Sequence, residues 1–501
     1  MANLFLGIDI GTSSVKSGIF DEEGHLQSKS MRDYQFTNPR DNWLEIEPEK
    51  WWDLSVETIQ EVIEKGKINP GDIAGISMCG IAHTPVMLDR ESNAVRPTIS
   101  WLDTRDLAQL QRLEQDETSE FILERTGNRI AGCHTLPQLL WVKEEEPDNF
   151  KRIRKIILSK DYVGYRLTGA LSTDLNNASA TLLFNNKELC WDDDICKLFH
   201  IPKDILPPVV KSSDVIGKVT GEAAQITGLK EGTPVVSGAG DASIAILGLG
   251  IVESGQTAVI AGTAGVIMSS WKRYIYDNRG RCFTLVHPAG EMWTLATATN
   301  TACTSLDWFQ SILDITGTVN YDIFNKAAGE SEPGAKGIIF HPFLAGERTP
   351  HWNPHARSTF FGCQLSHKRG DFIRAVMEGV ALSLYDCFLI HRDISGITET
   401  PINEIRLAGG ILNSPIWKRI LADILGKAIE IPEEKELGIL GCAINAAVGV
   451  GLYKSYEEAI KNMVRLREEI TPDMELHNGI YAKQFALYRR LYERLAPLYE
   501  G

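Results

Sequence analysis

The hydrophobic pattern of the first half of the chain predicts strands and helices that alternate. Apolar runs broken by a turn at residues 21–24 indicate a β meander over residues 4–36. A proline opens a stretch with helical spacing at residues 48–67. The pattern then predicts strands at 73–78 and 85–88, and helices at 104–126, 136–146 and 150–169. Alternation of this kind is typical of α/β proteins.

The second half repeats the alternation. A buried strand at residues 234–241 runs into a glycine turn and a helix that ends near Gly248. Beyond it the pattern predicts a hairpin at 257–269, helices at 300–315, 370–392 and 415–425, a strand at 404–410, and a charged helical tail from 455 onward. In that tail, apolar residues recur with the spacing of an amphipathic helix, at Tyr481, Phe485, Leu487, Leu491 and Leu495.

The length of the chain predicts two domains, because 501 residues are too many for one hydrophobic core. We place the boundary beside the helix that follows residue 241. This gives an N-terminal domain over residues 1–246 and a C-terminal domain over residues 247–501. The last helices are expected to pack back on the N-terminal domain. No flexible linker or low-complexity segment separates the halves, so close packing is expected.

Two glycine-threonine turns lie about half a chain apart, each between two apolar β runs. The first is Gly11-Thr12, followed by Ser13, and the second is Gly262-Thr263. Glycine lets backbone N–H groups approach an anion closely, and the threonine hydroxyls add donors. The repeat therefore predicts that two domains hold the phosphates of one nucleotide between them.

Composition and charge limit the partners. The chain is 43% hydrophobic and 23% charged, which is ordinary for a globular protein, and its net charge is −15. This balance argues against nucleic acid or an anionic membrane as partner, and no apolar stretch is long enough for a membrane span. The N-terminus lacks the basic segment of a signal peptide, so we expect a cytoplasmic protein.

The nine cysteines are scattered and include no Cys-x-x-Cys pair. Buried free thiols are therefore favoured over disulfides or a zinc site. Asn177-Ala-Ser179 matches a glycosylation acceptor, but it has no such meaning in a chain without a secretory signal.

Asp9 lies at the end of the first predicted strand, directly before the first glycine turn. An aspartate before a glycine is often only a turn former. Its place beside an anion-binding turn also suits it to hold Mg²⁺ against nucleotide oxygens. Both interpretations stay open at this point.

Asp241 follows Gly238 and Gly240 and precedes a short apolar helix. It is either a helix N-cap or a general base that takes the proton from a substrate hydroxyl. A helix N-terminus is expected to keep the carboxylate ionised, and the two glycines are expected to leave room for a ligand.

Four further groups allow both a structural and a binding role. Gly409-Gly410 lies in a predicted strand–turn–helix. Its small residues would let a flat adenosine approach, and Asn413 or Ser414 would be available to hydrogen-bond it. His83 precedes a strand and is either a structural histidine or a sugar contact. The two remaining groups are Trp101-Leu-Asp-Thr-Arg105, which either frames a sugar or caps a strand, and Glu347-Arg348, which is either a salt-bridged brace or a substrate contact.

Taken in order along the whole chain, these motifs resemble the FGGY family of carbohydrate kinases, closest to its xylulokinase branch. The motifs that carry the resemblance are Asp9-Ile-Gly-Thr12, Trp43-Leu-Glu-Ile-Glu-Pro48 with Trp51-Trp52, Trp101-Leu-Asp-Thr-Arg105, Leu139-Leu-Trp-Val142, Asp161-Tyr162 with Leu167-Thr-Gly169, Trp191, Gly238-Ala-Gly-Asp241, Ala261-Gly-Thr-Ala-Gly265, Gly346-Glu-Arg-Thr-Pro-His351, Phe361-Gly362, Arg374-Ala-Val-Met-Glu-Gly379, and Ala408-Gly-Gly410 with Trp417 and Ala422-Asp423.

The resemblance implies two ribonuclease H-like domains of the actin and hexokinase type, with a cleft between them. It also implies an ATP-dependent sugar kinase that uses Mg²⁺ and acts as a possible homodimer. Asp241 would then be the catalytic base and also contact the sugar, together with His83 and Trp101. Nucleotide phosphates would lie against Asp9 and the two Gly-Thr turns, and adenosine against the diglycine and Asn413.

Some positions depart from the family pattern. Gln138 stands where a lysine is usual, and Cys363 where an aliphatic residue is usual. Xylulokinases carry Gly-Gln-Met-His, whereas this chain has Gly80-Ile-Ala-His83. Glycerol kinases carry an Arg-Glu pair at the last two of these positions, so glycerol is not expected. The change leaves the sugar's identity open but not the phosphoryl transfer.

A ketopentose such as D-xylulose is the expected acceptor, with gluconate or another open-chain polyol as the alternative. A carboxylate substrate would need a cation near His83, for which Arg105 is a candidate. Two other classes compete: a non-catalytic sugar- or nucleotide-binding protein on this fold, and a chaperone-like or filament-forming ATPase. The retained aspartates and Gly-Thr turns argue against the first, and the Gly-Ala-Gly-Asp and Gly-Glu-Arg-Thr-Pro segments argue against the second.

Overall fold

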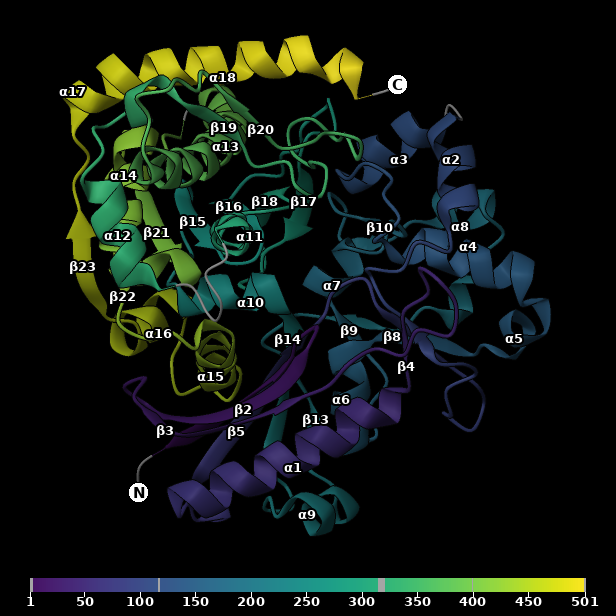
Figure 1. Ribbon diagram of the computed structural model, residues 1–501. Helices are drawn as coiled ribbons and strands as arrows, with labels where there is room; N and C mark the ends of the chain where they lie inside the picture. The colour runs from purple at the N-terminus through teal and green to yellow at the C-terminus, as the bar shows by residue number, and fades with distance from the viewer. Residues whose placement is uncertain (1–2, 116–117, 314–319, 399, 500–501) are drawn as a thin grey trace.

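Two mixed β-sheets form the framework of the molecule (Figure 1). The computed structural model describes residues 3–115, 118–313, 320–398 and 400–499. The N-terminal sheet has six strands in the order β13-β14-β5-β1-β2-β3. Their bounds are β1 (Leu4–Ile10), β2 (Ser14–Asp21), β3 (Leu26–Asp33), β5 (Ile73–Gly80), β13 (Val215–Lys218) and β14 (Pro234–Gly240).

The C-terminal sheet has seven strands in the order β17-β18-β16-β15-β21-β22-β23. Their bounds are β15 (Gln256–Ala261), β16 (Gly265–Trp271), β17 (Phe283–Val286), β18 (Trp293–Thr299), β21 (Glu404–Ala408), β22 (Ile429–Pro432) and β23 (Leu466–Ile470). The expected hairpin at 257–269 is thus the pair β15–β16.

The two sheets share one topology. In each, the first two strands pair antiparallel, and the first strand also pairs parallel with a strand that follows later in the chain. A further parallel strand extends each sheet on the same side. The two Gly-Thr turns therefore occupy equivalent places, between the first two strands of each sheet. This confirms the expected fold of two ribonuclease H-like domains.

Two helices lie between the sheets (Figure 1). Helix α10 (Asp241–Gly248) directly follows β14, and α15 (Leu437–Gly449) packs against it and against β1 and β5. Ile244 and Leu247 of α10 are buried in one cluster with Phe5 of the N-terminal sheet, whereas Ile246 is buried with Ala258 of the C-terminal sheet. A short helix with apolar residues on all sides thus joins the two cores.

Polar side chains of the N-terminal half also pair with β17, the edge strand of the C-terminal sheet. Asn128 donates to and accepts from the backbone of Thr284 at 2.9 and 2.7 Å. Asn176 donates to the carbonyl of Val286 at 2.6 Å, and the hydroxyl of Ser179 accepts from its N–H at 3.0 Å. These bonds satisfy an otherwise open sheet edge and tie the two halves together.

The remaining helices cover the outer faces of the sheets. On the N-terminal side these include α1 (Pro48–Gly66), α4 (Thr135–Glu145), α6 (Ser159–Thr168), α7 (Leu175–Ser179), α8 (Asp193–Leu198) and α9 (Gly221–Thr227). On the C-terminal side they include α11 (Thr304–Ile312), α12 (Tyr321–Gly329), α13 (Arg369–Thr398), α14 (Pro415–Leu425), α16 (Tyr456–Met463) and α18 (Ala482–Leu495). Helix α18 packs on the C-terminal core, where Tyr488 is buried, so the expectation that the last helices pack back on the N-terminal domain is wrong for α18. Within the described ranges, each helix is too short or too polar to cross a bilayer.

Three sequence-based helix assignments need correction. The expected helix at 104–126 is divided into α2 (Leu107–Gln115) and α3 (Thr118–Thr126), and residues 116–117 lie outside the described part. The expected helix at 150–169 is wrong, because strand β8 (Lys155–Leu158) separates α5 (Pro147–Arg152) from α6 and pairs with β6 (Pro85–Leu88). In the tail, β23 extends the C-terminal sheet where a helix was expected. For β8 and β23, pairing with a strand that is distant in sequence overrides local helical periodicity.

Candidate active site

Asp9 lies near the end of β1 and close to the start of α15, where its carboxylate can bind a cation. Its Oδ1 atom is buried and has no hydrogen-bond partner among the residues that the structure describes. A Cβ atom at Gly438, in the first turn of α15, would lie 2.9 Å from Asp9 Oδ2, so the two elements meet closely here. Burial raises the pKa of Asp9. An orphaned, buried carboxylate oxygen fits a hard cation such as Mg²⁺, which would favour its ionised form.

The two Gly-Thr turns present threonine and serine donors rather than glycine N–H groups. The N–H of Gly11 donates to Ser14 O at 2.9 Å, and that of Gly262 donates to Ala264 O at 3.0 Å. The N–H groups of the two glycines are therefore used within the turns, and the approach of other backbone N–H groups to an anion stays a prediction. Thr12, Ser13 and Thr263 remain as donors. At Gly262 a Cβ atom would meet nothing within 4 Å, so the approach is open.

Trp101 lies beside the first of these turns. Its indole Nε1 donates to Thr12 Oγ1 at 3.2 Å, which leaves the threonine hydrogen available for a ligand. Arg105, from the same motif, is 1% exposed and is held by Asp103 and Glu45 at 2.8 and 2.6 Å. The aspartate and arginine of the motif are therefore a structural brace, and Arg105 is not the free cation that a carboxylate substrate would need.

Asp241 is the first residue of α10, and its Oδ1 accepts from the N–H of Ala242 at 2.7 Å. Burial and the nearby charge of Asp9 raise its pKa to about 7. Burial and like-charge repulsion from Asp9 thus oppose the helix N-terminus, which is expected to favour the ionised carboxylate. A carboxylate that titrates near neutral pH is suited to general base catalysis.

The two glycines before Asp241 serve backbone packing. Gly238 has φ +81°, and a Cβ atom there would lie 1.7 Å from Met78 O of β5. A Cβ at Gly240 would meet the side-chain oxygens of Asn176 and Asn177 at 3.1 and 3.3 Å. The expectation that these glycines leave room for a ligand is therefore wrong: they allow β14 to approach β5 and α7.

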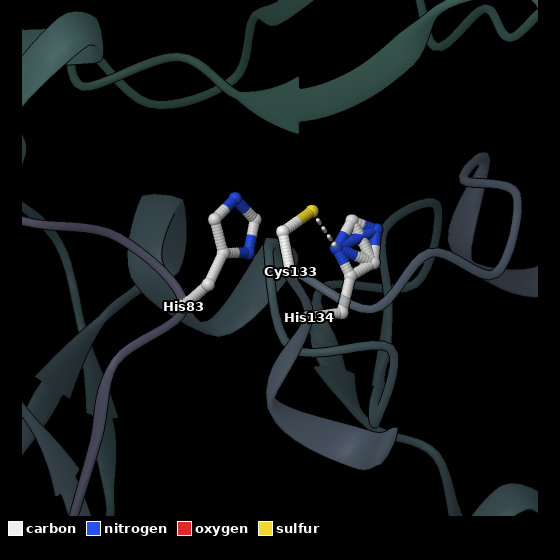
Figure 2. Close-up of side chains that lie close together, drawn as sticks. All are labelled: His83, Cys133 and His134. Atoms are coloured by element: carbon white, nitrogen blue, oxygen red, sulfur yellow. Dashed lines mark hydrogen bonds between the residues drawn. The ribbon is translucent and has the colours of Figure 1, made fainter. Parts of the chain in front are cut away.

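His83 and His134 stack face to face, with ring centroids 4.8 Å apart, and Cys133 lies beside them (Figure 2). Nδ1 of His83 donates to Ala180 O at 2.7 Å, which leaves Nε2 as an acceptor. Burial lowers the pKa of His83 to about 4, so it is neutral at pH 7. A neutral histidine with a free acceptor nitrogen suits a sugar hydroxyl.

The same three residues offer soft metal ligands within 4.8 Å of one another. Two features oppose a metal centre. The two ring planes lie within 19° of parallel, so their nitrogen atoms do not converge on one point. Burial raises the pKa of the Cys133 thiol to about 11, which disfavours the thiolate that binds a metal. We therefore interpret the cluster as the wall of an organic ligand site.

Asn177 is a site residue that the sequence analysis did not assign. It is 1% exposed, and within the described part of the chain neither its Oδ1 nor its Nδ2 has a hydrogen-bond partner. Its neighbour Asn176 is fully used, since it accepts from Gly240 N at 3.0 Å and donates to Val286 O. Unpaired amide groups this deep are costly unless a ligand or water satisfies them. Only the three-dimensional position beside Gly240 reveals this role, because the sequence signal suggested glycosylation.

The diglycine is shaped by close packing on one side. Gly409 has φ +97°, and a Cβ atom there would lie 2.3 Å from Ala261 O. Gly410 faces the hydroxyl of Tyr321, which is hydrogen-bonded to Asn413. Ser414 caps helix α14 by accepting from Trp417 N at 3.2 Å. Asn413 and Tyr321 are thus the polar groups beside the diglycine, and Ser414 has a structural role.

Glu347 and Arg348 do not brace each other through their side chains. The carboxylate of Glu347 accepts from the N–H groups of Asn300 and Arg348 at 2.9 and 2.8 Å. The guanidinium of Arg348 donates to Thr299 O at 3.1 Å. Of the two interpretations of this pair, the salt-bridged brace is therefore excluded.

Taken together, the site combines a titratable carboxylate, a neutral histidine and two hydroxyl-bearing turns on a duplicated ribonuclease H-like fold. This combination defines a phosphotransferase that acts on an alcohol group. The chain belongs to the FGGY family of carbohydrate kinases: the family's N-terminal domain matches residues 4–248 and its C-terminal domain residues 257–450. The protein is a sugar kinase, and kinases of this family use ATP.

The relatives include kinases named for two substrates. A xylulose kinase of Bacillus subtilis is 33% identical over 98% of this chain and 97% of its own length. A gluconokinase of the same organism is 29% identical over 95% of this chain and 93% of its own length. A ligand-bound xylulose kinase from Lactobacillus acidophilus superposes with a TM-score of 0.92 at 26% identity, covering 99% of each chain.

The raised pKa of Asp241 predicts how activity depends on pH. Because the base must be deprotonated, kcat/KM for the sugar is expected to rise with pH through about 7 and to level off above pH 8. His83 stays neutral throughout this range, since its pKa is about 4. Initial rates between pH 5.5 and 9 at saturating ATP measure this profile. A flat profile from pH 6 to 8 would show that Asp241 has an ordinary pKa or is not the base.

Proposed function

We propose that the protein transfers the γ-phosphate of ATP to a hydroxyl of a ketopentose, D-xylulose or a close analogue. The observation that carries the proposal is Asp241, a carboxylate with a pKa of about 7 at the start of a helix that joins both domains. The kinases named for xylulose among the relatives support the acceptor.

In this mechanism Asp241 takes the proton of the attacking hydroxyl as that oxygen forms a bond to the γ-phosphorus. The bond between the γ-phosphorus and the bridging oxygen breaks, and its electron pair leaves with ADP. Thr12, Ser13 and Thr263 donate hydrogen bonds to the phosphates. His83 Nε2 and the amide of Asn177 orient the sugar, with Trp101 beside them. Gly409, Gly410 and Asn413 hold the adenosine.

Asp9 is the residue that would hold Mg²⁺, because its buried Oδ1 has no protein partner. The ion, when bound, would offset negative charge on the nucleotide. In a protein with a net charge of −15, such local compensation is needed for an anionic substrate. The domain boundary near residue 247, the cytoplasmic location and a homodimer stay predictions.

Gluconate or another polyol is the second candidate acceptor, supported by the gluconokinase relatives. The test is coupled ADP release with Mg-ATP across xylulose, ribulose, fructose, gluconate, erythritol, ribitol and glycerol, with a blank that contains no sugar. Xylulose is expected to give the highest kcat/KM. A preference for gluconate would overturn the ketopentose assignment, and equal rates with and without sugar would overturn the kinase mechanism.

A further inference from the structure

Arg348 is held directly behind the second Gly-Thr turn. It belongs to the loop between β19 (Ile339–His341) and β20 (Thr359–Phe361), and its Nη2 donates to Thr299 O at 3.1 Å. Thr299 ends β18 and pairs with Gly265, whose N–H donates to Thr299 Oγ1 at 3.1 Å. The backbone of the turn packs against the same segment, since Ala302 N donates to Thr263 O at 2.8 Å. The guanidinium is thus anchored beside the C-terminal phosphate turn.

The positive charge of Arg348 also reaches the cluster of His83, Cys133 and His134 in the N-terminal half. Burial raises the pKa of the Cys133 thiol, and the positive charge of Arg348 opposes this rise, so the two groups lie within electrostatic reach. Cys133 lies beside His83 and His134 (Figure 2). Arg348 is therefore anchored beside the turn assigned to the nucleotide phosphates, and its charge reaches the cluster assigned to the sugar.

The charge of Arg348 is not neutralised by a carboxylate among the described residues. Its Nε is buried without a partner, and the adjacent Glu347 carboxylate is occupied by two backbone N–H groups. By contrast, Arg105 is paired with Asp103, and Arg281 with Asp277. Arg348 thus keeps donors of a planar guanidinium free, and these match the geometry of an oxyanion.

We propose that Arg348 binds the phosphoryl group during transfer, first as the γ-phosphate of ATP and then as the phosphate of the sugar ester. The inference rests on the proposed function. Arg348 donates hydrogen bonds to the phosphoryl oxygens, while Asp241 takes the proton of the sugar hydroxyl. A fixed cation between donor and acceptor sites stabilises the charge spread over the equatorial oxygens. A sugar carboxylate would offer the same oxyanion chemistry, and the experiment separates these two sources.

The variants are Arg348→Gln and Arg348→Lys, with Arg357→Gln as the matched control. Arg357 lies in the same loop and is exposed. Its guanidinium donates to two backbone carbonyls of that loop, those of Pro354 and Ala356. With xylulose, Arg348→Gln is expected to lower kcat by roughly 10²–10³. The KM for xylulose should change less than about threefold, and binding of the sugar phosphate product should weaken at least about tenfold. Arg348→Lys should recover part of kcat, and Arg357→Gln should match the wild type.

A second readout needs no sugar turnover, so it also holds if the proposed acceptor is wrong. The wild type is expected to bind a non-hydrolysable ATP analogue more tightly than ADP in the presence of Mg²⁺, and Arg348→Gln is expected to lose that preference. Melting curves of each variant confirm folding, and the lysine variant keeps the test open if the glutamine variant unfolds. Unchanged xylulose kinetics together with a raised KM for gluconate alone would assign the anion to a carboxylate and overturn the phosphoryl role. Unchanged kinetics and an unchanged nucleotide preference would overturn the site altogether.

Discussion

Replacing Asp241 by asparagine is expected to lower kcat for sugar phosphorylation by roughly 10²–10⁴, because asparagine cannot accept the hydroxyl proton. The amide keeps the size of the carboxylate, so the start of α10 is retained. Nucleotide affinity should change little, since the adenosine groups Gly409 and Asn413 belong to the other domain. Stopped assays of sugar phosphate formation and titrations with ADP measure the two effects separately.

A matched control for this variant is Asp193→Asn. Asp193 is also the first residue of a helix, α8, but it is exposed and pairs only with Lys203 at the surface. Its replacement is expected to leave kcat unchanged. If Asp241→Asn keeps more than about a tenth of wild-type kcat, the base lies elsewhere.

The same variant has a predicted effect on stability. The folded-state pKa of Asp241, about 7, is above the ordinary aspartate value, so the folded protein binds a proton that the unfolded chain releases. This group therefore destabilises the fold progressively as pH rises from about 4 to 7. Asp241→Asn is expected to raise the melting temperature at pH 8, and the difference from the wild type should shrink toward pH 4. The loss of activity would then coincide with a gain in stability, as is common for strained active sites.

The second large effect is expected from Lys160→Met, which should lower the free energy of unfolding by about 3–5 kcal/mol. Lys160 is 1% exposed, and its Nζ contacts the carboxylates of Asp161 and Asp174, the latter at 2.9 Å. Burial alone would lower the pKa of Lys160, but the two carboxylates raise it, so the ammonium form is held. Removing it leaves two buried carboxylates without a counter-ion. Urea unfolding followed by fluorescence measures the change.

This network also supports the active site. Asp174 Oδ1 caps α7 by accepting from Asn176 N and Asn177 N at 2.9 and 3.2 Å. A loss of Lys160 should therefore also raise the KM for sugar in whatever fraction stays folded. The matched control is Lys151→Met, an exposed lysine paired with Asp148 at 3.0 Å, which should change stability by less than about 1 kcal/mol. Equal stability of the two variants would show that the buried network is not a major support.

Much of the fold follows from sequence, because its pattern is local. The meander of β1–β3, the β15–β16 hairpin and the strand before Asp241 all show clear apolar runs that end in glycine turns. Strands β8 and β23 are different. Their residues are held by pairing with β6 and β22, which are distant in sequence, and helical spacing in the surrounding segment conceals them.

The candidate site likewise contains residues that the sequence reveals and others that only the structure reveals. Asp9, Asp241 and the Gly-Thr turns are recognisable because each combines a residue type with a strand end. Asn177 is not, because its significance lies in a buried amide without a partner among the described residues. Arg348 could be named from the sequence as a possible substrate contact, but not as a guanidinium without a carboxylate partner in the described part of the chain. Likewise, the sequence could not show that Arg105 is occupied or that Gly238 packs against Met78. These facts depend on contacts between residues far apart in the chain.

The most direct test of the account is to measure ADP and sugar phosphate in one reaction of Mg-ATP with xylulose, for the wild type and Asp241→Asn side by side. The account predicts equal amounts of both products from the wild type, almost no ADP without sugar, and a loss of both products together in the variant. ADP formation that continues without sugar, or a variant that still makes sugar phosphate at the wild-type rate, would contradict it.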